Sequence, residues 1–136
     1  MKPGIVIKIY RCMRWLYMHN MNIAAKLVYY VNYLLFNCVI PPSVVLENGV
    51  RVTHSVGIVL HQDTIIKTDS CICQNVSIVN GKVTIGRNCF IGSGSVIIGP
   101  VVIGDNVKIG ANTVVNIDIP DDCTVVGSKC RVLLRK

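Results

Sequence analysis

Aliphatic residues return every six positions through most of this 136-residue chain. This period is typical of a solenoid in which each six-residue unit supplies one strand and one corner, and three units make one triangular coil. A small or β-branched residue lies two positions before each of the later aliphatic residues, so two side chains per unit should face inward. The period predicts a mainly β fold, a single-stranded parallel β-helix of a little over four coils. Its aliphatic ladder comprises Ile40, Leu46, Val52, Leu60, Ile66, Ile72, Ile78, Ile85, Ile91, Ile97, Ile103, Ile109 and Val115.

The first 36 residues follow a helical period instead. We expect two short helices over residues 5–36 with a break at residues 19–22, where asparagines compete for backbone hydrogen bonds. These helices should cap one open end of the solenoid, whose strand edges would otherwise invite association, with Trp15 and the tyrosines packed in the contact. Pro41 and Pro42 end the helical part. The apolar stripe with i, i+4, i+7, i+8 spacing is Ile23, Leu27, Tyr30, Val31, Leu34 and Leu35.

Two domains follow from this division: an N-terminal helical segment, residues 1–38, and a β-helix domain, residues 39–136. The ladder of the second domain is interrupted twice. Asn80 and Gly81 add one residue before Ile85, and because this pair readily adopts positive φ we expect only a wider corner there. The other interruption adds two residues at positions 53–57 and carries His54, whose side chain can therefore project into a cleft beside the solenoid.

Outward-facing positions directly before the ladder residues are often apolar. We expect them to form one exposed apolar strip, and strips of this size usually mark interfaces. The strip comprises Val45, Val59, Ile65, Phe90, Val96, Val102 and Val114.

The charge balance is basic, with 14 Lys and Arg against 7 Asp and Glu. Residues 1–46 carry five of the basic residues and no acidic residue. Such an end is either solvated surface or a contact for phosphate, an anionic polymer or a membrane, so the sequence allows a peripheral membrane contact through the N-terminal segment. Nucleic acid is not expected as a partner, because no basic patch is interleaved with stacking aromatics.

The seven cysteines form an odd set without a Cys-x-x-Cys pair or the spacing of a metal site, so we expect reduced thiols and no metal. His54 and His61 are the only histidines of the solenoid. Charged residues interrupt any signal-peptide core near the N-terminus, and residues 27–46 are broken by asparagines and prolines. The expected location is the cytoplasm.

His54 is the candidate for chemistry. A histidine beside a cleft can take a proton from an acceptor hydroxyl as that hydroxyl attacks a thioester, and later pass the proton to the departing thiolate. Spacing alone favours a plainer alternative, a corner histidine at the surface.

The sequence resembles a known family. Its aliphatic-Gly-x-x-small-x units resemble the hexapeptide-repeat acyltransferases, whose β-helix is left-handed and which form homotrimers with active sites between neighbouring solenoids. Residues 50–60 and 73–78 resemble the serine acetyltransferase branch, and the helical segment is similar to the shortened N-terminal region of relatives that acetylate exopolysaccharide sugars. The resemblance implies a homotrimeric O-acetyltransferase that uses acetyl-CoA, with His54 at the position of the catalytic histidine.

The resemblance also implies a donor site. The family lays the pantetheine arm of coenzyme A between two solenoids, against main-chain groups of small residues, and the matching positions are Gly92, Ser93, Gly110 and Ala111. These are also ordinary corner residues, and glycine suits both roles. Arg131 lies in a segment that resembles the family's Gly-x-Pro-Ala-basic ending and is the candidate for the nucleotide phosphates.

Two departures from the serine acetyltransferases bear on the acceptor. Those enzymes place an aspartate directly before the histidine, where this chain has Thr53, and carry a second histidine in a long loop, where this chain has only the corner at Asn80 and Gly81. A hydroxyl of a sugar or polysaccharide precursor is therefore the expected acceptor. Serine, as in cysteine biosynthesis, is the alternative substrate, and a non-catalytic trimeric scaffold that docks on a membrane is the alternative from another class.

Overall fold

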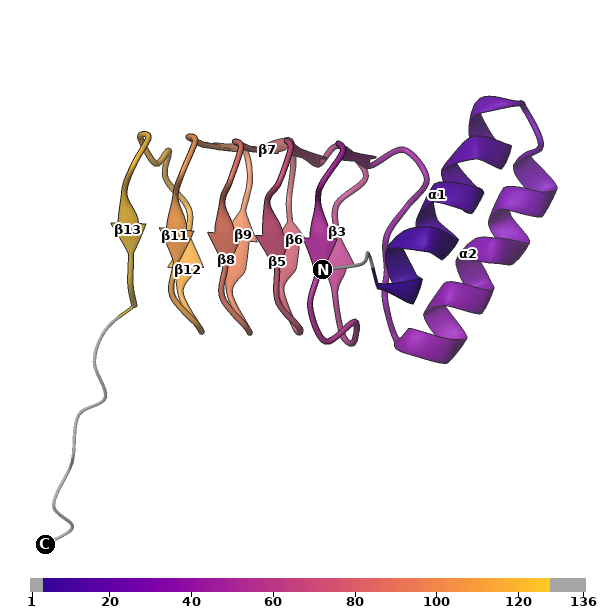
Figure 1. Ribbon diagram of the computed structural model, residues 1–136, viewed down its shortest axis with the longest axis horizontal. Helices are drawn as coiled ribbons and strands as arrows, with labels where there is room; N and C mark the ends of the chain where they lie inside the picture. The colour runs from indigo at the N-terminus through magenta and orange to yellow at the C-terminus, as the bar shows by residue number, and fades with distance from the viewer. Residues whose placement is uncertain (1–3, 128–136) are drawn as a thin grey trace, which may run out of the picture.

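The computed structural model describes residues 4–127, which form two helices followed by a solenoid (Figure 1). The helices are α1 (Ile5–Met18) and α2 (Asn22–Phe36). The strands are β1 (Val45–Leu46), β2 (Arg51–Val52), β3 (Val59–Leu60), β4 (Ile65–Ile66), β5 (Cys71–Ile72), β6 (Ser77–Val79), β7 (Val83–Ile85), β8 (Phe90–Ile91), β9 (Val96–Ile98), β10 (Val101–Ile103), β11 (Lys108–Ile109), β12 (Val114–Val115) and β13 (Thr124–Val125). The predicted parallel β-helix with a helical N-terminal segment is confirmed.

Three parallel sheets form the faces of the solenoid. Face 1 is β1-β4-β7-β10, face 2 is β2-β5-β8-β11-β13, and face 3 is β3-β6-β9-β12. Each strand pairs in register with the strand one coil away, so on face 2 Ile72 lies beside Val52 on one side and Ile91 on the other. The main-chain hydrogen bonds therefore run along the solenoid axis.

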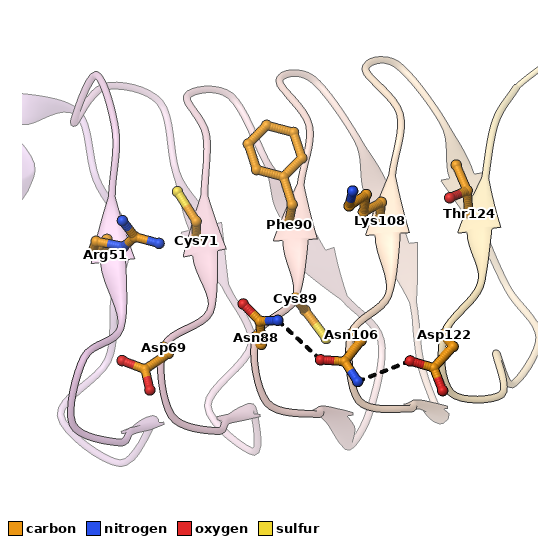
Figure 2. A pocket seen from close by; sticks show the side chains of 10 residues that line it. All are labelled: Arg51, Asp69, Cys71, Asn88, Cys89, Phe90, Asn106, Lys108, Asp122 and Thr124. Carbon is orange, nitrogen blue, oxygen red and sulfur yellow. Dashed lines mark hydrogen bonds between the residues drawn. The ribbon is translucent and has the colours of Figure 1, made fainter.

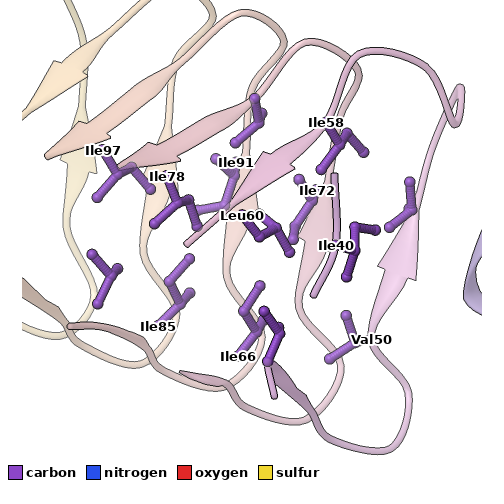
Figure 3. Close-up of a cluster of buried hydrophobic side chains, with 14 of the residues drawn as sticks. Ile40, Val50, Ile58, Leu60, Ile66, Ile72, Ile78, Ile85, Ile91 and Ile97 are labelled. Atoms are coloured by element: carbon purple, nitrogen blue, oxygen red, sulfur yellow. The ribbon is translucent and has the colours of Figure 1, made fainter. Parts of the chain in front are cut away.

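Ladder side chains fill the interior (Figure 3). All thirteen predicted ladder residues are buried except Leu46, which is half-buried. Burying each such side chain is worth about 1.5–3 kcal/mol. The second inward position of each later unit is also buried, and it holds Val83, Cys89, Ser95, Val101, Val107 and Thr113. The prediction of two inward residues per unit is confirmed.

The helix pair covers one end of the solenoid, as predicted (Figure 1). One face of α1 is buried and contains Val6, Ile7, Tyr10 and Met13. The Tyr10 hydroxyl donates to the carbonyl oxygen of Val44 at 2.5 Å, and Arg14 Nη1 donates to the carbonyl oxygens of Pro42 and Val44 at 2.9 and 2.6 Å. These side chains satisfy backbone groups at the end of the coil, which no further strand covers. The helix break is also confirmed, since Asn20 has a φ of 59°.

The predicted packing of aromatic residues in this cap is largely wrong. Tyr10 is buried, but Trp15 is 56% exposed, and Tyr17, Tyr30 and Tyr33 are also exposed. The apolar stripe of α2 faces solvent as well. Helix α2 is apolar on nearly every side, so its period predicts a helix but does not predict which side packs against the protein. In the structure the buried side is the one with Ala25 and Asn32. Neither helix of residues 4–127 is long and apolar enough to cross a membrane.

The outward apolar residues do not form one strip, which corrects the prediction. Consecutive units lie on different faces, because three units make one coil. Face 1 therefore carries Val45, Ile65 and Val102, face 3 carries Val59, Val96 and Val114, and Phe90 stands alone on face 2.

Candidate active site

His54 lies on a two-residue insertion that follows β2, at the corner between faces 2 and 3. The insertion has two residues in the left-handed backbone region, His54 with φ 52° and Gly57 with φ 69°. The Val56 N–H donates to the His54 carbonyl oxygen at 2.6 Å, which closes a tight turn. Because of this turn the chain leaves the regular corner and turns the His54 side chain out to solvent.

The left-handed conformation distinguishes His54 from similar residues. Ten non-glycine residues of the described chain have positive φ, and nine of them are asparagine or aspartate. Those side chains tolerate this region because they bond locally to the backbone, whereas for most residues it costs about 1–2 kcal/mol. Backbone strain of this kind occurs preferentially at functional sites. His54 is thus the one described residue other than asparagine, aspartate and glycine in this region, and its side chain is exposed.

Main-chain hydrogen bonds join the end of the insertion to the segments on both sides of it. The Val39 N–H donates to the Ile58 carbonyl oxygen at 2.7 Å, and the Asn75 N–H donates to the Val56 carbonyl oxygen at 3.1 Å. Fixed hydrogen bonds on both sides place His54 on a defined backbone rather than on a free loop. The His54 side chain itself makes no hydrogen bond within residues 4–127.

Thr53 does not orient the imidazole. Its hydroxyl donates to the Ile72 carbonyl oxygen at 3.3 Å, which turns the side chain toward the next coil. Residues 53–57 also contain no acidic residue. Within residues 4–127, one chain thus supplies a candidate base and no side chain that fixes its orientation.

The predicted donor residues lie on the same corner as His54. This corner, called here the site corner, consists of residues 53–58, 73–76, 92–95 and 110–113 in successive coils. Gly92 and Ser93 are two coils from His54, and Gly110 and Ala111 are three coils away. At about 4.8 Å per coil the column is roughly 14 Å long. An extended arm with its thioester at His54 can therefore run along these residues.

Main-chain groups at the site corner are open to a ligand. The Gly92 and Gly110 N–H groups bond to the next coil, but no hydrogen bond among residues 4–127 uses the N–H of Ser93 or Ala111. A Cβ added at Gly92 would lie 2.6 Å from the Ala111 nitrogen. Glycine is therefore required at this position by the close approach of the next coil. The N–H groups of Ser93 and Ala111, unused within residues 4–127, are the donors available to the amide carbonyls of a pantetheine arm.

Gln74 was missed by sequence reasoning. It lies on the site corner between the coil of His54 and the coil of Gly92, and its Oε1 atom is buried without a hydrogen-bond partner in the described chain. A buried amide oxygen of this kind normally has a partner. Position was the available signal, because Gln74 is one of two polar residues, with Asn75, at the site corner one coil from the histidine.

A separate hollow of about 440 Å³ lies on face 2 (Figure 2). Its walls include Arg51 on β2, Phe90 on β8 and Lys108 on β11, but His54 is not among its lining residues. Cys71 also lies here, and burial followed by the nearby Cys73 raises the pKa of its thiol. We do not assign this hollow to the candidate chemistry.

The remaining candidates lie elsewhere. His61 is on the corner between faces 3 and 1, where its Nδ1 accepts from the Asp63 N–H at 3.3 Å, so it does not join His54 within one chain. Arg131 lies outside the described residues. Within residues 4–127, no group of three His, Cys, Asp or Glu side chains is close enough to hold a metal ion.

Comparison with known proteins gives consistent matches. Residues 82–116 match the family described as bacterial transferase hexapeptide (six repeats). The serine acetyltransferase of Synechococcus elongatus is 34% identical over 141 residues, covering 98% of this chain and 58% of that protein. The fold superimposes with a TM-score of 0.88 on serine acetyltransferase isoform 3 of Entamoeba histolytica in complex with cysteine (27% identity, 96% of this chain, 49% of that one). A serine acetyltransferase in complex with CoA gives a TM-score of 0.86 (28% identity, 94% and 55%). The chain thus spans about half the length of these relatives.

Proposed function

Because the chain belongs to the hexapeptide-repeat transferases, in the serine acetyltransferase-like branch, we propose that it transfers the acetyl group of acetyl-CoA to a hydroxyl oxygen. The observation that carries this proposal is the site corner. His54 stands at one end of it in a strained backbone conformation, and the free N–H groups of Ser93 and Ala111 follow along it.

The reaction needs one base and no change of oxidation state. The imidazole of His54 takes the proton of the acceptor hydroxyl as its oxygen attacks the thioester carbonyl. The tetrahedral intermediate then collapses, the carbon–sulfur bond breaks, and the thiolate of coenzyme A receives the proton from the imidazolium. The products are an acetate ester and free coenzyme A.

Serine is the acceptor that the relatives support best. The curated relative and both solved structures described above are serine acetyltransferases, so they favour this alternative over the sugar hydroxyl expected from the sequence. We propose serine first and keep a sugar hydroxyl as the second candidate. Two observations favour the sugar hydroxyl. The Thr53 hydroxyl donates to the Ile72 carbonyl oxygen. Residues 53–57 contain no acidic residue, so the ammonium group of serine would have no counter-charge there.

We further propose a homotrimer, in which a neighbouring solenoid closes the site corner. This would complete a site that in one chain has a base without an orienting partner. Face 3 borders the site corner and carries Val59, Val96 and Val114, with Val114 60% exposed. Exposed apolar rows of this kind are suited to contact between subunits. Acetyl-CoA as donor favours the cytoplasm as the location of this reaction.

Donor binding and acceptor choice are tested separately. Calorimetric titration with acetyl-CoA should show saturable binding at about one site per chain, and thiol release should then appear with L-serine. Release with sugars but not with serine would establish the second candidate. No binding by the folded protein at millimolar donor would contradict the enzyme proposal and favour a non-catalytic scaffold.

A bulky side chain at the site corner tests the placement of the donor. Ala111→Tyr puts an aromatic ring on an exposed corner position beside a free N–H, so the dissociation constant of acetyl-CoA should rise at least tenfold. Gln62→Tyr, at an exposed position on the corner between faces 3 and 1, is the matched control and should bind normally. Equal affinity in both variants would place the donor elsewhere.

A further inference from the structure

The exposed side of α2 is apolar over its whole length. Its exposed apolar residues are Ile23 (83%), Leu27 (63%), Tyr30 (49%), Val31 (46%), Leu34 (78%) and Leu35 (67%). They recur at helical spacing and so share one face, which is called here the α2 face. The opposite side of the helix is already packed, through Ala25, Val28 and Asn32. Contiguous apolar surface of this extent on one helix indicates a binding surface.

Basic residues lie on the border of the α2 face and on the neighbouring helix α1. Lys26 is exposed and lies three residues after Ile23 and four before Tyr30, so it borders the face directly. Lys8 and Arg11 are exposed on α1, which lies beside α2 (Figure 1). Residues 1–46 contain no acidic residue. A second copy of this surface would bring like charges together, whereas an anionic surface complements them.

Exposed aromatic residues provide a third observation. Trp15 is 56% exposed on α1, and Tyr30 and Tyr33 are 49% and 44% exposed on α2. Tryptophan and tyrosine with an apolar ring and a polar end are favoured at the boundary between lipid headgroups and acyl chains. Apolar residues, lysine and arginine, and exposed aromatic rings together are the composition of helices that lie in this boundary.

We propose that the α2 face docks on an anionic lipid bilayer and lies along its surface. The helix of 15 residues is about 22 Å long, shorter than the hydrocarbon core of about 30 Å, and one side of it is held by protein. Leu27 and Leu34 enter the acyl boundary, and Lys26, Lys8 and Arg11 contact the headgroup phosphates. The docking does not depend on the proposed acetyl transfer or on its acceptor.

Flotation with vesicles tests the proposal on the full-length protein. It should bind vesicles of equal parts phosphatidylcholine and phosphatidylglycerol, should not bind phosphatidylcholine alone, and should release at high salt. The double variant Leu27→Glu, Leu34→Glu should lower the bound fraction at least tenfold. Ile117→Glu, which changes a 66% exposed residue of the solenoid, is the matched control and should bind like the original chain. Thermal unfolding confirms that both variants fold.

The single tryptophan of the chain gives an independent readout. Trp15 emission should shift to shorter wavelength when the anionic vesicles are added, and the double variant should not show this shift. Failure of the unmodified protein to bind anionic vesicles overturns the proposal, as does equal binding by the double variant. Sedimentation without lipid tests the alternative that the α2 face binds a second copy of the chain. If the original chain forms an assembly that the double variant does not form, the α2 face joins copies of the chain and the proposal is wrong.

Discussion

At the scale of single residues, the backbone of His54 is as informative as its side chain. A surface corner in this solenoid uses asparagine, aspartate or glycine wherever φ is positive, and His54 is the exception in the described chain. The imidazole is also exposed and makes no hydrogen bond within residues 4–127, so packing there does not explain why a histidine occupies this conformation. Packing among residues 4–127 thus leaves the imidazole accessible, as the proposed role as a base requires.

The variant His54→Asn separates chemistry from conformation. Asparagine suits the left-handed region, so the melting temperature should stay the same or rise, while turnover should fall roughly 10²–10⁴-fold because the general base is lost. Thiol release and thermal unfolding measure the two effects. His61→Asn, on another corner, should leave turnover unchanged. Full activity in His54→Asn would show that His54 is an ordinary corner residue and not the general base.

Thr64 offers a test of buried polarity. It is 1% exposed, and its Oγ1 atom has no hydrogen-bond partner in the described chain. Thr64→Val keeps the shape and removes this group, so the free energy of unfolding should rise by about 1–2 kcal/mol. Ser70 is the contrast, because its Oγ donates to the Gly86 carbonyl at 2.8 Å and accepts from the Cys89 N–H at 3.0 Å. Ser70→Ala should lower the free energy of unfolding by about 1–3 kcal/mol in chemical denaturation. A change of the same sign in the free energy of unfolding of both variants would contradict this account.

At the scale of elements, the sequence predicts whatever repeats along the chain. The period of six reports side chains that stack on the next coil, so the ladder and the inward second position could be assigned residue by residue. Asn80 and Gly81 form the expected wider corner, with φ values of 59° and 103°.

What depends on neighbours in space was harder to predict. The outward residues were grouped by their chemistry rather than by every third unit, so Val45 and Val59 were placed on one strip although they lie on different faces. For α2, an apolar helix has two plausible packing sides, and only the position of α1 selects one. For the site corner, the resemblance gave the candidate residues, which stay a prediction. The positive φ of His54 and the unpartnered Gln74 oxygen are properties of the folded chain that no pattern in the sequence reports.

The contact between neighbouring coils at Arg87 and Asp105 should depend on pH. The Arg87 N–H donates to Asp105 Oδ1 at 2.7 Å and its guanidinium donates to Oδ2, and these bonds hold the pKa of Asp105 below its ordinary value of 3.8. A depressed carboxyl pKa gives stability that is present above the unfolded pKa and is lost as the pH falls through the folded one. The free energy of unfolding should therefore fall more steeply below about pH 4 in the original chain than in Asp105→Asn. Denaturant titrations over this range measure both slopes, and equal slopes would show that the pair does not contribute.

At the scale of the whole molecule, the helical cap and the site lie at the same end. His54 is on the first coil, and the start of α1 reaches it: a Cβ added at Gly4 would lie 3.2 Å from Ser55 Oγ and 3.4 Å from the Val52 carbonyl oxygen. The site corner, with the residues proposed to bind the donor, runs from this end toward the other. If the α2 face docks on a membrane, the acceptor end of the site is the end that faces it.

The cap also protects the solenoid from association. Removing residues 1–36 would expose the carbonyl oxygens of Pro42 and Val44 that Arg14 now covers, together with the apolar surface under Tyr10 and Met13. An open strand edge beside apolar surface is a template for pairing with another chain. The truncated chain should therefore retain β structure by circular dichroism but elute as large, polydisperse aggregates, whereas Leu27→Glu on the outer side of α2 should not aggregate. A monodisperse truncated chain with an unchanged melting temperature would show that the end of the solenoid is stable without its helices. The role of α1 and α2 would then lie in what their outer surface binds.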